Sequence, residues 1–295
     1  MVDHLNDKKE VVPTAEELIS HFEEFKTIPQ IAMRVCQLIA RENSTIREIE
    51  EVLRLDPILV SRLLRMVNSA YYGIRYRVES IAKAVVFIGL KNLRNLVVID
   101  TVKDCFLREA AGLTFSHKHL WMHSTAVGVC AQMISRRLLG TTGEDAFLAG
   151  ILHDIGLLIE DQVQPTAFQT MMQRYRDGDR PIVDEEHAAL GTDHCVVGGL
   201  LATRWKFPED VKTAIVEHHT MHTEEAELIL LPAIVQIAHY LADISDYREI
   251  PERMENPTGI VAEHIRKRAA EYRVLARDFS EEMKKASSFY EVDAA

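Results

Sequence analysis

The sequence predicts an all-α protein: a multi-helix bundle preceded by a helical lobe in the amino-terminal half. Apolar residues recur at helical spacing over most of the 295-residue chain, and helix-capping residues precede most of these stretches. No convincing strand pattern interrupts them. The one β-rich stretch, residues 85–88, is too short and too closely flanked by helix signals to be a strand.

Capping residues divide the amino-terminal half into successive helices. A side-chain oxygen at a helix start accepts a hydrogen bond from a free backbone N–H group, and proline is favoured in the first turn. Gly89 is expected to end one helix, and another begins at Leu90. The expected helix starts are Thr14, Thr27 with Pro29, Ser44 or Thr45 with Glu48 as capping-box partner, Asp56 with Pro57, and Ser80.

Helix signals continue through the second half. We expect a helix over residues 120–139 and another from about Glu144 that continues through the stretch GILHDIGLLIE at 150–160. Further helices are expected over 162–176, from about Asp184, Pro208 and Glu225, and after Pro251 and Pro257. The predicted division is a polar tail at 1–13, the lobe at 14–108, a core at 109–245 and a charged helical extension at 246–295.

Composition predicts a soluble protein of the cytoplasm. The chain has no run of about 18 apolar residues that would span a membrane, and its polar amino terminus lacks the apolar core of an export signal. The four cysteines are widely separated and form no CxxC pair. We therefore interpret them as small buried apolar residues in a reducing compartment.

Charge is unevenly distributed along the chain. The net charge of −11 argues against general nucleic-acid binding, which needs clustered cations. Residues 57–108 nevertheless carry nine cations and three acids. These cations either form helix faces that contact the acidic remainder of the chain, or form a patch for an anionic ligand or partner. The candidates for such a patch are Arg62, Arg65, Arg75 and Lys91.

The stretch GILHDIGLLIE places His153 and Asp154 within an apolar run. A buried carboxylate needs a partner, because an isolated charge in an apolar environment is strongly disfavoured. A cation, a hydrogen-bond donor or a metal ion would each serve. The histidines in the rest of the sequence favour a metal. Asp154 could then bridge two ions through its two oxygens.

Further histidines occur in other apolar helical stretches. His119 and His123 are four residues apart and share one helix face, and Asp243 also lies among apolar residues. Many buried imidazoles would need many hydrogen-bond partners, whereas a shared cation satisfies several at once. Imidazole and carboxylate together suit iron, manganese, nickel, cobalt or zinc in a mononuclear or binuclear site. The predicted metal ligands are His123, His153, Asp154, Asp243, His194, His218, His219 and His119.

These motifs resemble a known family. The order His123, His153-Asp154, Asp243 is similar to the H…HD…D pattern of the HD superfamily of metal-dependent phosphohydrolases. The stretches TIPQIAMRVCQLI, DPILVSRLLRMVNSAYYG, GILHDIGLL and GTDHCVVGGLLATRWKFPEDV resemble the HDOD family, the HD-related output domains of bacterial signalling. The resemblance covers about residues 22–243. It implies an HD-like helical core and a divalent metal site, with His194, His218 and His219 similar to the additional histidines of the binuclear branch.

The chain departs from its catalytic relatives at two places. Position 157 is leucine, where the HDIGK pattern has a lysine that can hold a phosphate. His218 and His219 are followed by TMHTEEA without a GYP element, so a typical cyclic di-GMP phosphodiesterase is not expected. His119 stands where some relatives carry glutamate, and the resemblance gives it the role of a third-metal ligand or a support for the ligands.

Two functions remain open from the sequence. In the first, the chain is an interaction module of bacterial signal transduction, whose metal stiffens the core while its surface binds a signalling protein or a small anionic ligand such as a nucleotide. In the second, it is a metal-dependent phosphohydrolase acting on a nucleotide or other phosphoester, with arginine or lysine of the 57–108 segment holding the phosphate. Leu157, the missing GYP element and the apolar surroundings predict a closed site and favour the first.

Overall fold

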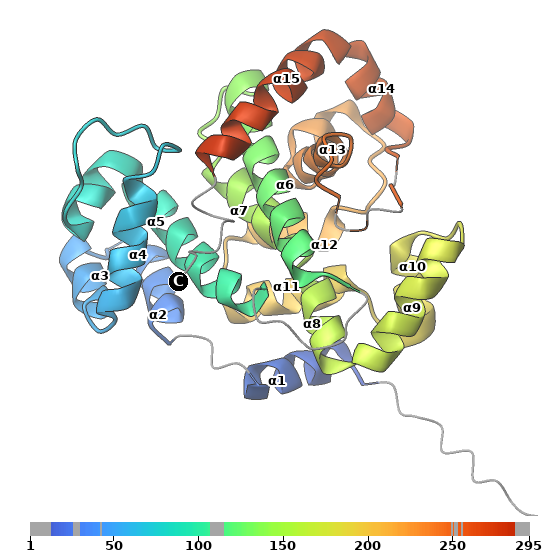
Figure 1. The fold of residues 1–295 in the computed structure, drawn as a ribbon, viewed down its shortest axis with the longest axis horizontal. Helices are drawn as coiled ribbons and strands as arrows, with labels where there is room; N and C mark the ends of the chain where they lie inside the picture. The colour runs from blue at the N-terminus through green and yellow to red at the C-terminus, as the bar shows by residue number, and fades with distance from the viewer. Residues whose placement is uncertain are drawn as a thin grey trace, which may run out of the picture.

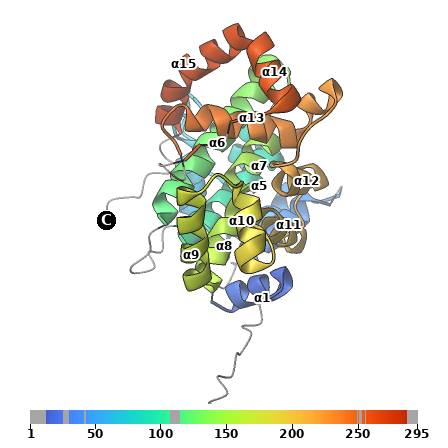
Figure 2. The same cartoon turned by 90° about the vertical axis from the view of Figure 1, so that its right-hand side faces the viewer.

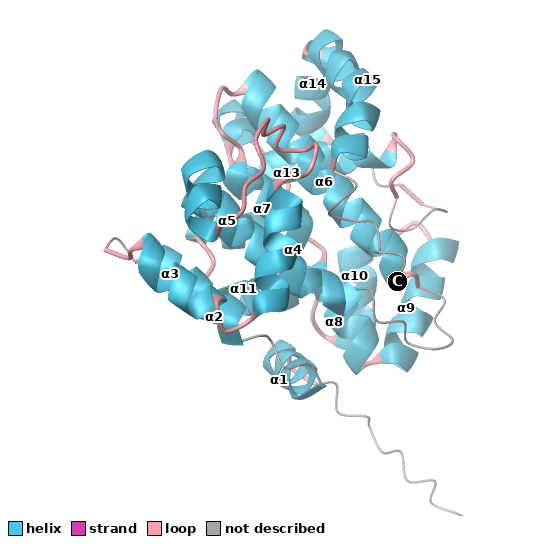
Figure 3. Cartoon of the chain, turned by 60° about the vertical axis from the view of Figure 1, so that its left-hand side comes forward, coloured by secondary structure: helices cyan, strands magenta, loops and turns pink. Residues whose placement is uncertain are grey.

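The computed structural model describes residues 13–25, 30–41, 43–106, 115–248, 250, 253–254 and 256–286. These residues contain helices and loops but no strand, which confirms the predicted all-α class (Figures 1 and 3). Most of the predicted polar tail, the cap at Thr27 and Pro29, and Pro251 lie outside the described residues. No described helix is both long enough and apolar enough to cross a membrane.

Helices α2 to α5 pack together at one end of the molecule (Figure 1). Thr45 and Glu48 form the predicted capping box, and Asp56 accepts a hydrogen bond from the backbone N–H of Leu59. Gly89 interrupts α5 with φ 78°, so the predicted break between two helices is confirmed. The bounds are α2 Gln30–Ile39, α3 Ile46–Leu53, α4 Pro57–Val67 and α5 Ile81–Phe106.

Helix α1 (Ala15–Phe25) lies apart from α2 to α5 (Figure 1). It packs against α8 (Ile155–Val163) and α11 (His194–Arg204). Its side chains Leu18 and Ile19 are fully buried there. We expected this helix to form part of the amino-terminal lobe, but its apolar face contributes to the core around the later helices.

The core is built around α6 (His117–Leu138), which packs against α7 (Glu144–Leu152) and α13 (Leu231–Asp243). Helices α6 and α7 approach closely because each has a glycine at the contact. A Cβ atom on Gly150 would lie 2.6 Å from the Cα atom of Gly128. The carboxyl end of α7 is therefore held against the helix that carries His123.

The single helix predicted through residues 144–160 is wrong. Helix α7 ends at Leu152 and α8 begins at Ile155, with His153 and Asp154 in the turn between them. Periodicity did not reveal this break because apolar residues are buried on all sides of both helices, and neither glycine nor proline stands at the turn. The polar pair is instead held by tertiary contacts.

Helix α11 was not predicted from the sequence. Gly191 ends α10 (Ile182–Leu190) with φ 69°, and the side chain of Asp193 then caps α11 by accepting a hydrogen bond from the backbone N–H of Val196. The adjacent Gly198 and Gly199 lower the helix propensity of this stretch. Helix α10 pairs with α9 (Pro165–Asp177), and α11 with α12 (Glu209–Glu217).

The carboxyl-terminal helices lie over α6 and α13 (Figure 2). The predicted charged helix is divided into α14 (Gly259–Lys267) and α15 (Ala269–Lys285). Tyr272, Leu275 and Phe279 of α15 are buried. The helix expected from Glu225 is a 3₁₀ turn, Glu225–Ile229, followed by α13.

Candidate metal centre

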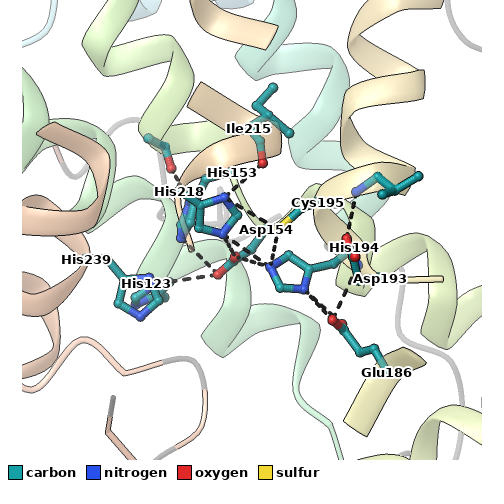
Figure 4. Close-up of polar contacts among 12 residues, drawn as sticks. His123, His153, Asp154, Glu186, Asp193, His194, Cys195, Ile215, His218 and His239 are labelled. Carbon is teal, nitrogen blue, oxygen red and sulfur yellow. Dashed lines mark hydrogen bonds and ion pairs between the residues drawn. The ribbon is translucent and has the colours of Figure 1, made fainter. Parts of the chain in front are cut away.

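Imidazole and carboxylate side chains from separate helices meet in the buried interior of the core (Figure 4). Asp154 lies at the middle of this centre. The turn between α7 and α8 supplies His153 and Asp154, while the other side chains come from α6, α11, α13 and the end of α12. The contributing histidines are His123, His153, His194, His218, His219 and His239.

Four side chains form a first donor group, comprising His123, His153, Asp154 and His239. One ligand atom from each lies within 4.8 Å of the others. Oδ2 of Asp154 is 3.0 Å from Nε2 of His153 and 3.7 Å from Nε2 of His123. The group is buried, except that the His239 side chain is 14% exposed.

A second donor group lies on the other side of Asp154 and comprises His194, Cys195, His218 and His219. Oδ1 of Asp154 is 3.4 Å from Nε2 of His218 and 3.6 Å from Nε2 of His194. Asp154 therefore turns one oxygen toward each group, which is the arrangement of a bridging carboxylate.

Hydrogen bonds to the outer ring nitrogens fix which atom each histidine turns toward Asp154. Nδ1 of His153 donates to the Gly150 carbonyl at 2.8 Å, and Nδ1 of His218 donates to the Ile215 carbonyl at 2.9 Å. Nδ1 of His194 donates to the Glu186 carboxylate at 2.8 Å. Because these oxygens only accept, each neutral ring carries its lone pair on Nε2.

These lone pairs face one another and the Asp154 carboxylate. Nε2 of His194 is 3.2 Å from Nε2 of His218. Among the described residues, neither Nε2 of His153 nor Oδ2 of Asp154 has a hydrogen-bond partner. Buried acceptors that face acceptors are unfavourable unless a cation lies among them. The side chains therefore fit a divalent metal ion, for which imidazole and carboxylate are suitable ligands.

Burial and neighbouring charge set the protonation of the centre. Burial lowers the pKa of His153 to about 3, so this imidazole is neutral and can bind a metal. Burial would raise the pKa of Asp154, but the imidazole of His153, followed by those of His218 and His194, outweighs it and holds that pKa well below its usual range. Burial likewise opposes protonation of His218, yet Cys195 and Asp154 raise its pKa to about 9. The negative groups that favour this proton would equally attract a metal ion in its place, and the ring would then bind the ion through a neutral Nε2.

Two buried acids, Glu186 and Glu160, lie close to His194, and Glu186 contacts it directly. Besides its contact with Nδ1, the Glu186 carboxylate accepts from the backbone N–H of His194 at 3.4 Å. Glu160 of α8 is completely buried, and burial followed by the charge of Glu186 raises its pKa well above the usual range. The contact that orients the His194 ring is the one with the Glu186 carboxylate.

Two of the predicted ligands lie outside both donor groups. Oδ1 of Asp243 is 3.6 Å from Nδ1 of His123, the nitrogen that also contacts the Tyr247 carbonyl, so Asp243 adjoins the first group without belonging to it. His119 is exposed, one turn before His123, and lines a separate depression with Met122 and Tyr247.

Three contributors to the centre were missed from the sequence: His239, Cys195 and Glu186. His239 stands four residues before Asp243, the same helical spacing that drew attention to His119 and His123. Cys195 directly follows His194 and had been interpreted as apolar core. Glu186 carried no detectable signal, because its contact with His194 depends on how α10 meets α11.

Two of the four residues of the predicted anion patch form ion pairs within the chain. Arg62 donates two hydrogen bonds of 2.7 Å to Asp100, and Lys91 contacts Asp145 at 2.8 Å. Arg65 and Arg75 line a groove of about 920 Å³ beside α4, away from the donor groups. For Arg62 and Lys91, the structure therefore favours helix faces that contact acids of the same chain.

A cavity of about 590 Å³ adjoins the centre, so the prediction of a closed site is wrong. His218, His219 and His239 line its inner side. Its described lining includes no residue of the 57–108 segment. The cation at this cavity is Arg253, which donates to the carbonyls of Gly178 and Arg180 at 3.0 and 2.6 Å.

Comparison with known proteins gives consistent results. The family model for the HDOD domain matches residues 25–221. A Treponema pallidum protein is 24% identical over 258 residues, covering 81% of this chain and 47% of that protein, so the chain spans about half the length of this curated relative. An HDOD domain protein of Geobacter sulfurreducens has a TM-score of 0.71 at 22% identity, covering 93% of this chain and 95% of that one. A Shewanella amazonensis protein described as a candidate phosphohydrolase has a TM-score of 0.70 at 27% identity, covering 92% and 96%.

Proposed function

This chain belongs to the HDOD family, and we propose that it is an output module of bacterial signal transduction with a divalent-metal centre in its core. The observation that carries the proposal is the convergence of Nε2 lone pairs on the two oxygens of Asp154. A metal bound by the folded state alone stabilises that state. The centre would thus join α6, α11, α12 and α13 around the α7–α8 turn.

The types of ligand atom restrict which metal ions the centre would bind. Neutral imidazoles with one carboxylate favour iron, manganese, nickel, cobalt or zinc over calcium and magnesium, which prefer all-oxygen ligands. The two donor groups on either side of Asp154 accommodate one ion each.

The surroundings of the centre favour binding over turnover. Leu157 is buried and supplies no cation for a phosphate. The guanidinium of Arg253 is held by backbone carbonyls and lies 4.0 Å from the centre of the Tyr175 ring. Asp179 and Asp184 also line the cavity and disfavour a multiply charged phosphate. We propose a signalling protein or a small anionic ligand of low charge as the partner.

Metal analysis of the purified full chain tests the metal centre. We expect stoichiometric divalent transition metal in the wild type, and removal by a chelator should lower the melting temperature. Asp154→Asn should lose most of the metal and the response to chelator, because it weakens both donor groups together. Asp161→Asn is the matched control: this buried aspartate of α8 pairs with Nε2 of His117 at 2.6 Å instead. Wild-type protein that takes up no metal, even after loading, would refute the proposal.

The cavity favours a second candidate function, hydrolysis of a nucleotide or other phosphoester. Three histidines of the centre line it, so a ligand can reach the donor groups. The Shewanella relative described as a candidate phosphohydrolase is 27% identical. A bound divalent ion would supply Lewis acidity at the phosphoryl group. His219 and His239, which line the cavity, would lie next to the bound substrate.

A panel of nucleotides and cyclic dinucleotides separates the two functions. Wild-type protein loaded with iron or manganese is incubated with each compound, and phosphate or ring-opened product is measured. Turnover that Asp154→Asn abolishes and Asp161→Asn retains would establish hydrolysis. The output-module proposal expects binding without turnover, detected as a ligand-dependent rise in melting temperature.

A further inference from the structure

Cys195 occupies an unusual position for a buried cysteine. It lies in the first turn of α11, directly after His194, and only 5% of it is exposed. Sγ is 3.5 Å from Nε2 of His194 and 3.9 Å from Nδ1 of His218. The sulfur therefore belongs to the second donor group rather than to the apolar core (Figure 4).

We propose that Cys195 is a metal ligand, so that the second position of the centre binds its ion through a thiolate together with the imidazoles of His194, His218 and His219. This inference rests on the proposed metal centre. It goes further by assigning a sulfur donor, which the predicted set of histidines and aspartates does not contain.

The separations between donor atoms support this assignment. Metal–nitrogen bonds of about 2.0–2.1 Å and metal–sulfur bonds of about 2.3 Å place tetrahedral donors roughly 3.4 Å apart for two nitrogens and roughly 3.6 Å apart for nitrogen and sulfur. Nε2 of His194 is 3.2 Å from Nε2 of His218 and 3.5 Å from Sγ of Cys195. Both separations are close to the edges of a tetrahedral site.

The other described cysteines lack such surroundings. Cys36 and Cys130 are buried in apolar helix contacts and belong to neither donor group, and burial raises the pKa of each to about 12. Cys105 contacts the Thr101 carbonyl within its own helix. Cys195 is thus the cysteine that the fold places among several imidazoles.

A thiolate would change which ions the position accepts. Soft sulfur ligands select zinc and related ions over manganese and magnesium, which prefer oxygen. With Oδ1 of Asp154 as the bridging ligand, these four donors would fill the coordination of the second ion with protein atoms, as in structural metal sites. Closure of the second position agrees with an output module that uses metal to hold its helices together.

Cobalt substitution of the full chain tests the ligand directly. The wild type loaded with cobalt(II) should show a near-ultraviolet sulfur-to-cobalt charge-transfer band in addition to its visible bands. Cys195→Ser should lose the charge-transfer band and bind up to one cobalt fewer, while visible bands from the first group remain. Cys130→Ala is the matched control, since this cysteine is equally buried, and it should keep the band.

Zinc X-ray absorption of the loaded wild type gives a readout that needs no variant, in which a sulfur shell at about 2.3 Å is expected. Cobalt binding without the charge-transfer band, a band that persists in Cys195→Ser, or an absent sulfur shell would overturn the thiolate ligand and leave the metal centre intact. Failure of the wild type to bind any metal would refute both proposals.

Discussion

Gly156 of α8 lies against the backbone of His194, so closely that a Cβ atom at position 156 would be 2.1 Å from the His194 carbonyl oxygen and 2.5 Å from its Cα atom. This contact joins the first turn of α8 to the first turn of α11. It therefore sets the distance between Asp154, which precedes α8, and His194, which begins α11. Glycine at this position therefore allows α11 to lie this close to α8.

Gly156→Ala should push α11 away from Asp154, because the atoms in its way belong to the backbone and cannot rotate aside. We expect a loss of stability of about 1–3 kcal/mol or more, as overpacked cores show, with a larger proportional loss of metal from the second donor group. Urea unfolding and metal analysis of the same samples measure both effects.

Gly198→Ala is the matched control in α11. Its new methyl group would meet Cγ2 of Ile215 at 2.9 Å, a side-chain contact less severe than the 2.1 Å approach to backbone at Gly156. The Gly198→Ala variant should lose less stability and retain more metal than Gly156→Ala. Equal metal retention in the two variants would show that the contact at Gly156 does not position the centre.

Glu186→Gln should weaken metal binding without removing any ligand. The carboxylate accepts from Nδ1 of His194 at 2.8 Å and fixes both the tautomer and the ring orientation. Loss of such a support typically reduces metal affinity by about 10–100-fold. Competition with a zinc indicator measures the change.

The adjacent Glu185 supplies a control for that substitution. Its carboxylate pairs with Arg180 at 3.3 Å and Arg174 at 3.6 Å and does not contact His194. Glu185→Gln should leave zinc affinity unchanged. A comparable loss of affinity in both variants would mean that general loosening of α10, and not the contact with His194, is responsible.

Residues whose side-chain chemistry is distinctive could be singled out from the sequence alone. His123, His153 and Asp154 were identified because polar groups in apolar helices need partners, and the structure brings all three together. The capping box of Thr45 and Glu48 and the break at Gly89 were predicted because their signals are local. The all-α class followed from the same helical periodicity.

The features that were missed depend on tertiary contacts. The break at His153 and Asp154 has no local signal, and α11 is a helix despite two adjacent glycines because Gly198 and Gly199 allow close packing against Ile215 and Val216. The role of Glu186 requires α10 to meet α11, which no spacing along the chain reveals. Charge counting along residues 57–108 likewise could not show that Arg62 and Lys91 have acidic partners.

Asp145 connects α7 to α5 through both Lys91 and Arg94, each at 2.8 Å. Burial would raise the pKa of Asp145, but hydrogen bonds from Lys91 and Arg94, together with their charges, lower it below its ordinary value of 3.8. The carboxylate consequently stabilises the fold in its ionised form. That contribution is complete above the unfolded-state pKa and is lost as pH falls through the lower folded-state pKa.

Asp145→Asn should therefore reduce the free energy of unfolding by roughly 1–2 kcal/mol at pH 7, as expected for a charged hydrogen bond that is partly exposed to solvent. The difference from wild type should narrow as pH falls below 3.8 and through the lower folded-state pKa, where the wild-type carboxylate becomes protonated. Urea unfolding of both proteins at several pH values measures this. Asp104→Asn, an exposed substitution on α5, should show little difference at any pH. If Asp145→Asn instead leaves stability at pH 7 unchanged, its ion pairs with Lys91 and Arg94 do not stabilise the fold.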